Sequence, residues 1–143
     1  MGRTYVAIDL ETTGLDPTQD EIIEVAAVRF TPEGIGETFT SFVKARKTIP
    51  LEVQLLTGIR QQDLTGAPPF AALAGDLLAF VGDATIVAQN APFDMGFLAN
   101  AGLDFANPVL DTLELARILV PQLTERNLTA LRSEEHTSEL QSH

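Results

Sequence analysis

Two acidic residues, Asp9 and Glu11, lie at the end of an apolar stretch near the start of the chain. Residues 5–11 have the composition of a strand. Successive side chains of a strand point to opposite faces, so these two acids should share one face. Carboxylates side by side on a buried strand repel each other and resist ionisation, and a hard divalent cation between them removes that penalty. The pair therefore predicts half of a metal site.

A third acidic residue, Asp94, ends the segment Gln89-Asn-Ala-Pro-Phe-Asp94. Pro92 suits the first position of a helix, which places Asp94 in the first helical turn. An acid there either matches the positive end of the helix dipole or binds a ligand, and the residues alone leave both open. The interpretation of the segment Thr12-Thr-Gly-Leu15 is left open in the same way. It can be a plain turn, in which Gly14 permits a positive φ and the threonine hydroxyls bond locally.

The net charge of −11, from 20 acidic and 9 basic residues, argues against tight nonspecific binding of duplex nucleic acid. It does not exclude an enzyme that holds one strand end through metal ions. We interpret the basic cluster Lys44, Arg46 and Lys47 as a solvated strand end rather than a phosphate contact. The chain has no cysteine, no membrane-spanning apolar run and no secretory N-terminus, so we expect a cytoplasmic protein and no membrane partner.

The apolar periodicity predicts an α/β protein with a mixed sheet flanked by helices. Phe70, Leu73, Leu77 and Phe80 recur at helical spacing and are expected to be core residues. Strands are predicted at residues 5–11, 22–30, 37–43, 85–88 and 108–111, and helices at 51–56, 70–81, 92–99 and 113–120.

Three segments resemble, in the same order, the motifs of the DEDDh family of 3′–5′ exonucleases: Asp9-Leu-Glu-Thr-Thr-Gly-Leu15, Leu56-Thr-Gly-Ile59 and Asn90-Ala-Pro-Phe-Asp94. The family includes the proofreading subunit of bacterial DNA polymerase III and the nuclease domain of DinG-type helicases. The resemblance covers residues 4–131 and implies a ribonuclease H-like fold. It also implies a bacterial enzyme of replication or repair, with a polymerase or a fused helicase domain as its partner.

The resemblance implies a role for each motif residue. Asp9 would bridge two Mg²⁺ or Mn²⁺ ions, Glu11 would bind one of them and Asp94 would hold the second. The substrate would be the single-stranded or frayed 3′ end of DNA, with RNA as a possible substitute. The terminal nucleotide would meet Thr12, Thr13, Gly14, Leu15, Leu56, Thr57, Asn90 and Phe93.

The sequence departs from the family at two places. Gln89 stands where many members of the family have a histidine, and that histidine is not the general base. More seriously, the family's His-x-x-x-x-Asp motif, which supplies the general base and a fourth carboxylate, is missing, because Gln141 stands five residues after His136. Asp111 resembles a structural aspartate of the family. Losing a general base costs about 10²–10⁴-fold in rate. The expected result is a nearly inactive fragment, and the alternative is a non-catalytic nucleic-acid-binding or scaffold module.

Residues 132–143 resemble the translation of a sequencing-library adapter. We therefore exclude this tail from fold reasoning. The predicted exonuclease domain covers residues 1–131 and ends before the third motif.

Overall fold

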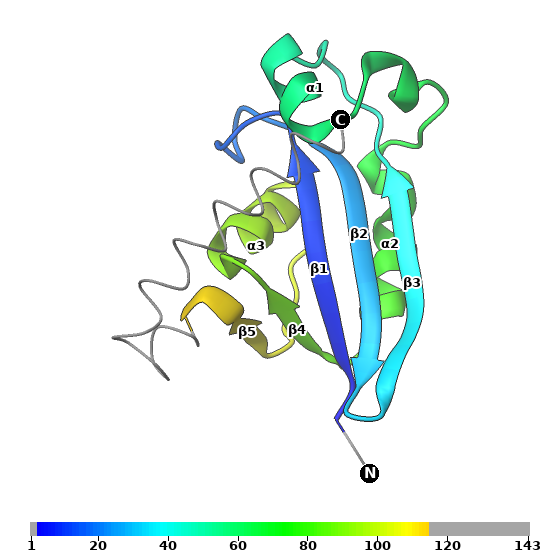
Figure 1. Ribbon diagram of the computed structural model, residues 1–143, viewed down its shortest axis with the longest axis vertical. Coiled ribbons are helices and arrows are strands. Elements are labelled where there is room, and N and C mark those ends of the chain that lie inside the picture. Colours follow the sequence, from blue (N-terminus) through cyan, green and yellow to red (C-terminus); the bar gives the residue numbers. More distant parts are fainter. Residues whose placement is uncertain (1–2, 115–143) are drawn as a thin grey trace.

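The computed structural model describes residues 3–114 (Figure 1). Most of the predicted helix at 113–120 and the whole predicted tail at 132–143, with His136, lie outside the described residues. No helix within the described part is long and apolar enough to cross a membrane. The elements, in chain order, are β1 (Tyr5–Thr12), β2 (Ile22–Thr31), β3 (Gly34–Phe42), α1 (Leu51–Thr57), the 3₁₀ helix η1 (Gln61–Leu64), α2 (Phe70–Val81), β4 (Thr85–Ala88), α3 (Ala91–Asn100) and β5 (Val109–Asp111).

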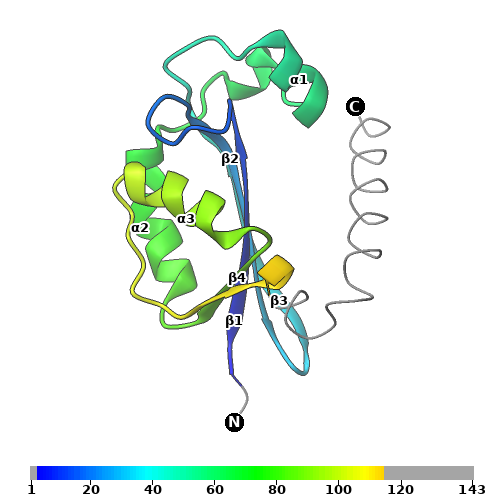
Figure 2. The same ribbon diagram turned by 90° about the vertical axis from the view of Figure 1, so that its left-hand side faces the viewer.

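The five strands form one mixed sheet in the order β3-β2-β1-β4-β5. The β1–β2 and β2–β3 pairs are antiparallel, while β1–β4 and β4–β5 are parallel. Helices α2 and α3 cover one face of this sheet, and α1 lies beyond the end at which β1 finishes (Figures 1 and 2). This arrangement confirms the predicted α/β fold class.

The main core fills the space between the sheet and its two covering helices. Its buried residues include Val6, Ile8 and Leu10, which occupy alternate positions of β1. Asp9 and Glu11 occupy the intervening positions and therefore point to the other face. Asp9 is exposed and Glu11 is partly buried, so the prediction that both acids lie on a buried strand is wrong for Asp9.

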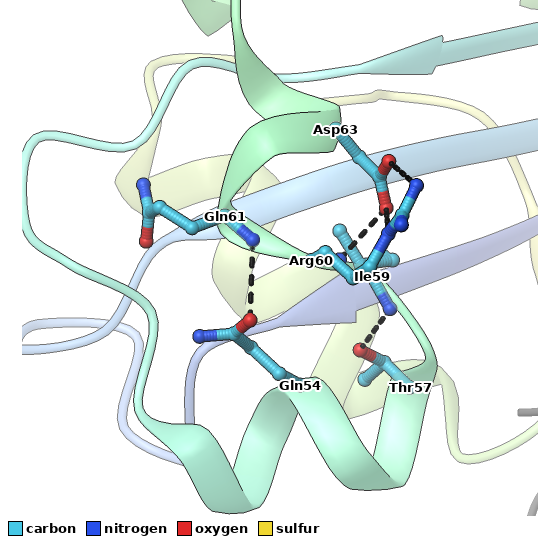
Figure 3. A network of polar contacts seen from close by, with 6 residues as sticks. All are labelled: Gln54, Thr57, Ile59, Arg60, Gln61 and Asp63. Atoms are coloured by element: carbon cyan, nitrogen blue, oxygen red, sulfur yellow. Dashed lines mark hydrogen bonds and ion pairs between the residues drawn. The ribbon is translucent and has the colours of Figure 1, made fainter.

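A smaller apolar cluster of Ile23, Ile49, Ile59 and Leu64 supports the region around α1 and η1. Helix α1 itself contributes no buried residue. Polar contacts attach its C-terminal end to the following segment instead (Figure 3). The Gln61 amide donates to Gln54 Oε1 at 3.2 Å, the Ile59 amide donates to Thr57 Oγ1 at 3.1 Å, and Arg60 pairs with Asp63. These polar contacts, together with the partly buried Val53 that packs on the apolar cluster, hold α1 in place.

Arg29 of β2 links the sheet to the end of α2. Its guanidinium donates to the Phe80 carbonyl at 2.6 Å, lies 4.4 Å from the Phe80 ring centroid and pairs with Glu37 at 3.0 Å. Replacing Arg29 with methionine should lower the free energy of unfolding by about 1–3 kcal/mol, because a charged hydrogen bond and a cation–π contact are both lost. Urea unfolding measures this change.

The matched control for Arg29→Met is Glu37→Gln. The Glu37 side chain is 78% exposed, so its ion pair with Arg29 should contribute little to stability. An equal loss of stability in both variants would contradict the role assigned to the Phe80 contacts.

Candidate active site

The sheet face that carries Asp9 and Glu11 also carries a third carboxylate, that of Glu24. In the β1–β2 register Glu11 lies opposite Glu24, and residues directly opposite in antiparallel strands share a face. Burial, followed by the negative charge of Asp9, raises the pKa of Glu24. Glu24 was not predicted from the sequence as a site residue, although the alternation along residues 22–30 could have placed it on this face.

Asp94 lies in the first turn of α3 and is only 4% exposed. Burial raises its pKa to about 7, and the charges of Asp9, Glu11 and Asp111 add to that rise in descending order. The structure therefore brings Asp94 into the electrostatic field of the two predicted β1 ligands. This result favours the interpretation that Asp94 binds a ligand over a simple match to the helix dipole, because the dipole would favour the charged form of Asp94.

The donor set suits a hard divalent cation, because carboxylate oxygens are its preferred ligands and the mutual repulsion of these acids is relieved by positive charge. Within residues 3–114, however, no three His, Cys, Asp or Glu side chains are grouped closely enough to hold a metal ion as they stand. Metal binding would therefore require these carboxylates to draw closer together.

The raised pKa of Asp94 predicts a pH dependence of stability in the absence of metal. Since the folded pKa of about 7 exceeds the ordinary value of 3.8, the folded state binds more protons than the unfolded state between these values. The free energy of unfolding should fall as pH rises from about 4 to about 7. Asp94→Asn should flatten this slope in urea unfolding with EDTA, whereas the exposed control Asp76→Asn should keep it. An unchanged slope in Asp94→Asn would overturn the assignment.

The loop after β1 is held by its threonines. Thr12 Oγ1 donates to the Gly14 carbonyl at 2.6 Å, and Thr13 Oγ1 accepts the Glu21 amide at 2.9 Å. Both threonine hydroxyls thus bond within the protein, as the turn interpretation allowed. The freedom of Gly14 to adopt a positive φ is not used, since Gly14 is not among the described glycines with positive φ. Gly14 instead makes a close approach to a side chain: a Cβ there would lie within 3.0 Å of the Asp20 carboxylate, which would have to move.

Two of the predicted nucleotide-binding leucines are accessible: Leu15 is 83% exposed and Leu56 is 44% exposed. Thr57, by contrast, uses its hydroxyl within the protein. That hydroxyl donates to the Val53 carbonyl at 2.8 Å. It also accepts the Ile59 amide (Figure 3). The structure therefore gives Thr57 a structural function at the end of α1.

The turn between β4 and α3 is built around Asn90, which adopts the left-handed conformation with φ 60° and ψ 59°. Its amide donates to Asp111 Oδ1 at 3.0 Å, and the same oxygen accepts the Leu113 amide at 3.0 Å. These bonds confirm the structural role predicted for Asp111. Phe93 packs on Phe97 with ring centroids 4.9 Å apart, and with Asp94 it lies in the first turn of α3.

Comparison with known proteins decides the family. A profile described as Exonuclease matches residues 6–143. The chain belongs to the exonuclease family. It is 41% identical over 134 residues to the PolC-type DNA polymerase III of Bacillus cereus, and 38% identical over 138 residues to the 3′-5′ exonuclease DinG of Bacillus subtilis. These alignments cover 90% and 92% of this chain, but only 9% and 15% of the two relatives.

The exonuclease fold is also found in solved structures. Escherichia coli exonuclease I in complex with a dA16 oligonucleotide superposes with a TM-score of 0.71 at 25% identity, covering 84% of this chain and 30% of that one. The predicted membership of a 3′–5′ exonuclease family and the predicted ribonuclease H-like fold are therefore confirmed. This exonuclease domain is of the PolC and DinG kind, and it corresponds to a small part of each longer relative.

Proposed function

We propose that this chain carries the metal-binding half of a 3′–5′ exonuclease site that hydrolyses nucleotides from DNA 3′ ends. The observation that carries the proposal is that Asp94 is buried within the electrostatic reach of two other acids: burial raises the pKa of its carboxyl, and the charges of Asp9 and Glu11 raise it further. The name of the DinG relative and the oligonucleotide bound to exonuclease I support the reaction and the substrate class.

The acids have separate roles in this proposal. Asp9 would bind both of two divalent cations, Mg²⁺ or Mn²⁺, Glu11 would bind one of them and Asp94 would hold the second. The exonuclease family is divalent-metal dependent. Such ions, when bound, supply an activated water and stabilise the charge that develops on the phosphate and the leaving 3′ oxygen. Glu24, opposite Glu11, adds negative charge to the same face without a ligand role assigned to it.

In this proposal, the terminal nucleotide lies against the loop after β1 and the end of α1. The exposed Leu15 and Leu56 side chains contact its base, while Thr12, Thr13 and Gly14 follow its sugar. Asn90 and Phe93 line the same site from the start of α3. Thr57 acts indirectly, because its hydroxyl bonds keep the end of α1 in the position that presents Leu56.

The general base is the missing component. The 143 residues contain no His-x-x-x-x-Asp sequence, and His136 lies outside the described residues. We therefore propose that the chain as given is nearly inactive and that a complete domain works in the bacterial cytoplasm with a polymerase or a fused helicase domain. The same missing motif favours the alternative, a non-catalytic module that binds nucleic acid without cleaving it.

A test of end recognition separates this site from a general nucleic-acid-binding surface. The chain should bind a linear oligo(dT) more tightly than a circular one of equal length, because only the linear strand offers a 3′ end. The preference should require a divalent cation such as Ca²⁺, which occupies oxygen sites, and should vanish in EDTA. Fluorescence anisotropy measures both affinities. Equal affinity for the two strands with Ca²⁺ would contradict the proposal.

A further inference from the structure

The basic cluster Lys44, Arg46 and Lys47 follows β3, and the structure changes its interpretation. Arg29 and Arg60 form salt bridges with Glu37 and Asp63. No salt bridge within residues 3–114 involves the three clustered cations. All three residues are exposed, in a chain whose net charge is −11. The cluster is therefore a concentrated positive site on an otherwise acidic protein.

The backbone of the segment 44–47 is held in one conformation. Both the Arg46 and the Lys47 amides donate to the Glu21 carboxylate, at 2.8 and 3.1 Å. The Lys44 amide donates to the Pro68 carbonyl at 2.8 Å. The Glu21 carboxylate thus keeps its charge but accepts hydrogen bonds from backbone amides, and no salt bridge within residues 3–114 joins it to the Arg46 or Lys47 side chain.

The same residue ties this segment to the loop beside the acidic site. The Glu21 amide donates to Thr13 Oγ1, and the Thr13 amide donates to the Glu21 carbonyl at 2.8 Å. One residue therefore joins the segment 44–47 to the loop that follows Asp9 and Glu11. A strand that reaches this loop therefore lies near the backbone of the segment that carries the three cations.

Lys44 also lines a groove of about 580 Å³ with Gln61, Gln62, Thr65 and the backbone of Gly66. The remaining lining residues are Ala45, Leu64 and Ala67, so the groove combines hydrogen-bonding and apolar groups and contains one cation and no acid. Phosphate oxygens accept hydrogen bonds from such groups, and contacts of this kind position a nucleic-acid strand without reading its sequence. The groove extends the basic surface of the segment 44–47.

We propose that the segment 44–47 and this groove bind backbone phosphates of the DNA strand whose 3′ end occupies the acidic site. The inference rests on the proposed function and adds a second contact region to it. The positive charge compensates for the repulsion between an acidic protein and a polyanion. Glu21 is a positioning residue in this account, because it orients the two cations through their backbone amides.

The test compares strands that reach different distances from the 3′ end. Arg46→Gln and Lys47→Gln should each weaken binding of an oligo(dT) of about 16 nucleotides and lower its salt dependence, log Kd against log salt, by about 0.7 per lost phosphate contact. Binding of a strand of about 4 nucleotides should stay unchanged. The matched control is Arg3→Gln, which removes an equal charge before β1, at the end of that strand opposite Glu11.

Glu21→Ala separates positioning from simple charge. It retains the backbone bonds to Thr13 and removes a negative charge, so electrostatics alone predicts tighter binding of the long strand. Our account predicts weaker binding, because Arg46 and Lys47 lose their orientation. If the Arg46 and Lys47 variants keep the affinity and salt dependence of the unmodified chain, the inference is overturned. The proposed function still stands in that case if the unmodified chain prefers linear over circular strands. If the wild-type chain binds neither strand, the proposed function and this inference both fail.

Discussion

Restoring a His-x-x-x-x-Asp segment should make this chain trim DNA about 10²–10⁴-fold faster, the range by which a positioned general base accelerates proton transfer. In this experiment a segment with that motif, taken from a DEDDh exonuclease, replaces residues 132–143. The substrate is a single-stranded oligonucleotide labelled at its 5′ end, so that removal of nucleotides from the 3′ end gives a descending ladder. The reaction should require Mg²⁺ or Mn²⁺ and stop in EDTA.

The control for this graft carries alanine in place of the introduced histidine. It should bind the oligonucleotide as the grafted chain does but cleave it at the slow rate of the original 143-residue chain. Equal rates for the graft and its alanine control would contradict the general-base explanation. Rapid trimming by the original chain would show that it is not nearly inactive.

Asp9→Asn should weaken Mn²⁺ binding by at least about 10-fold, since even indirect supports of a metal site are worth about 10–100-fold in affinity. Asp9 is the strongest candidate for this effect because its charge acts on both Asp94 and Glu24. The substitution preserves the volume of the side chain and removes its charge. Isothermal titration with Mn²⁺ measures the affinity directly.

Two further variants show whether the loss is specific. Asp76→Asn removes an equal charge from the exposed side of α2, which covers the sheet face opposite to that of Asp9, and should leave Mn²⁺ affinity unchanged. Glu24→Gln should have a smaller effect than Asp9→Asn, since no ligand role is assigned to Glu24. An equal loss of affinity in all three variants would mean that Mn²⁺ affinity depends only on the net charge of the chain. This result would contradict a specific site at Asp9.

The long, periodic elements of this fold could be predicted from the sequence. Helix α2 and strand β4 have the predicted bounds, because helical spacing of apolar residues and a short apolar run between turns are strong local signals. Strand β3 begins earlier than predicted, at Gly34, since pairing with Thr31 and Phe30 extends the hairpin almost to its turn. Local composition alone does not predict this pairing between strands.

Features that depend on tertiary contacts were missed or misjudged. The 3₁₀ helix η1 is held by the Gln61 side chain, which accepts the Ile49 amide at 2.7 Å, and by a buried Leu64. The exposure of Asp9 follows from helices covering only one sheet face among the described residues. The motif residues could be identified by spacing, whereas the burial of Asp94 arises from packing between α3 and the sheet.

The central claim is that Asp9, Glu11 and Asp94 together hold divalent cations for hydrolysis at a DNA 3′ end. The most direct test is the anomalous scattering of Mn²⁺ in crystals of this chain grown with the metal and a short oligo(dT). Our account predicts density for Mn²⁺ bound by carboxylate oxygens of Asp9, Glu11 and Asp94, beside the terminal phosphodiester. Mn²⁺ bound elsewhere, with these three carboxylates still apart, would contradict it.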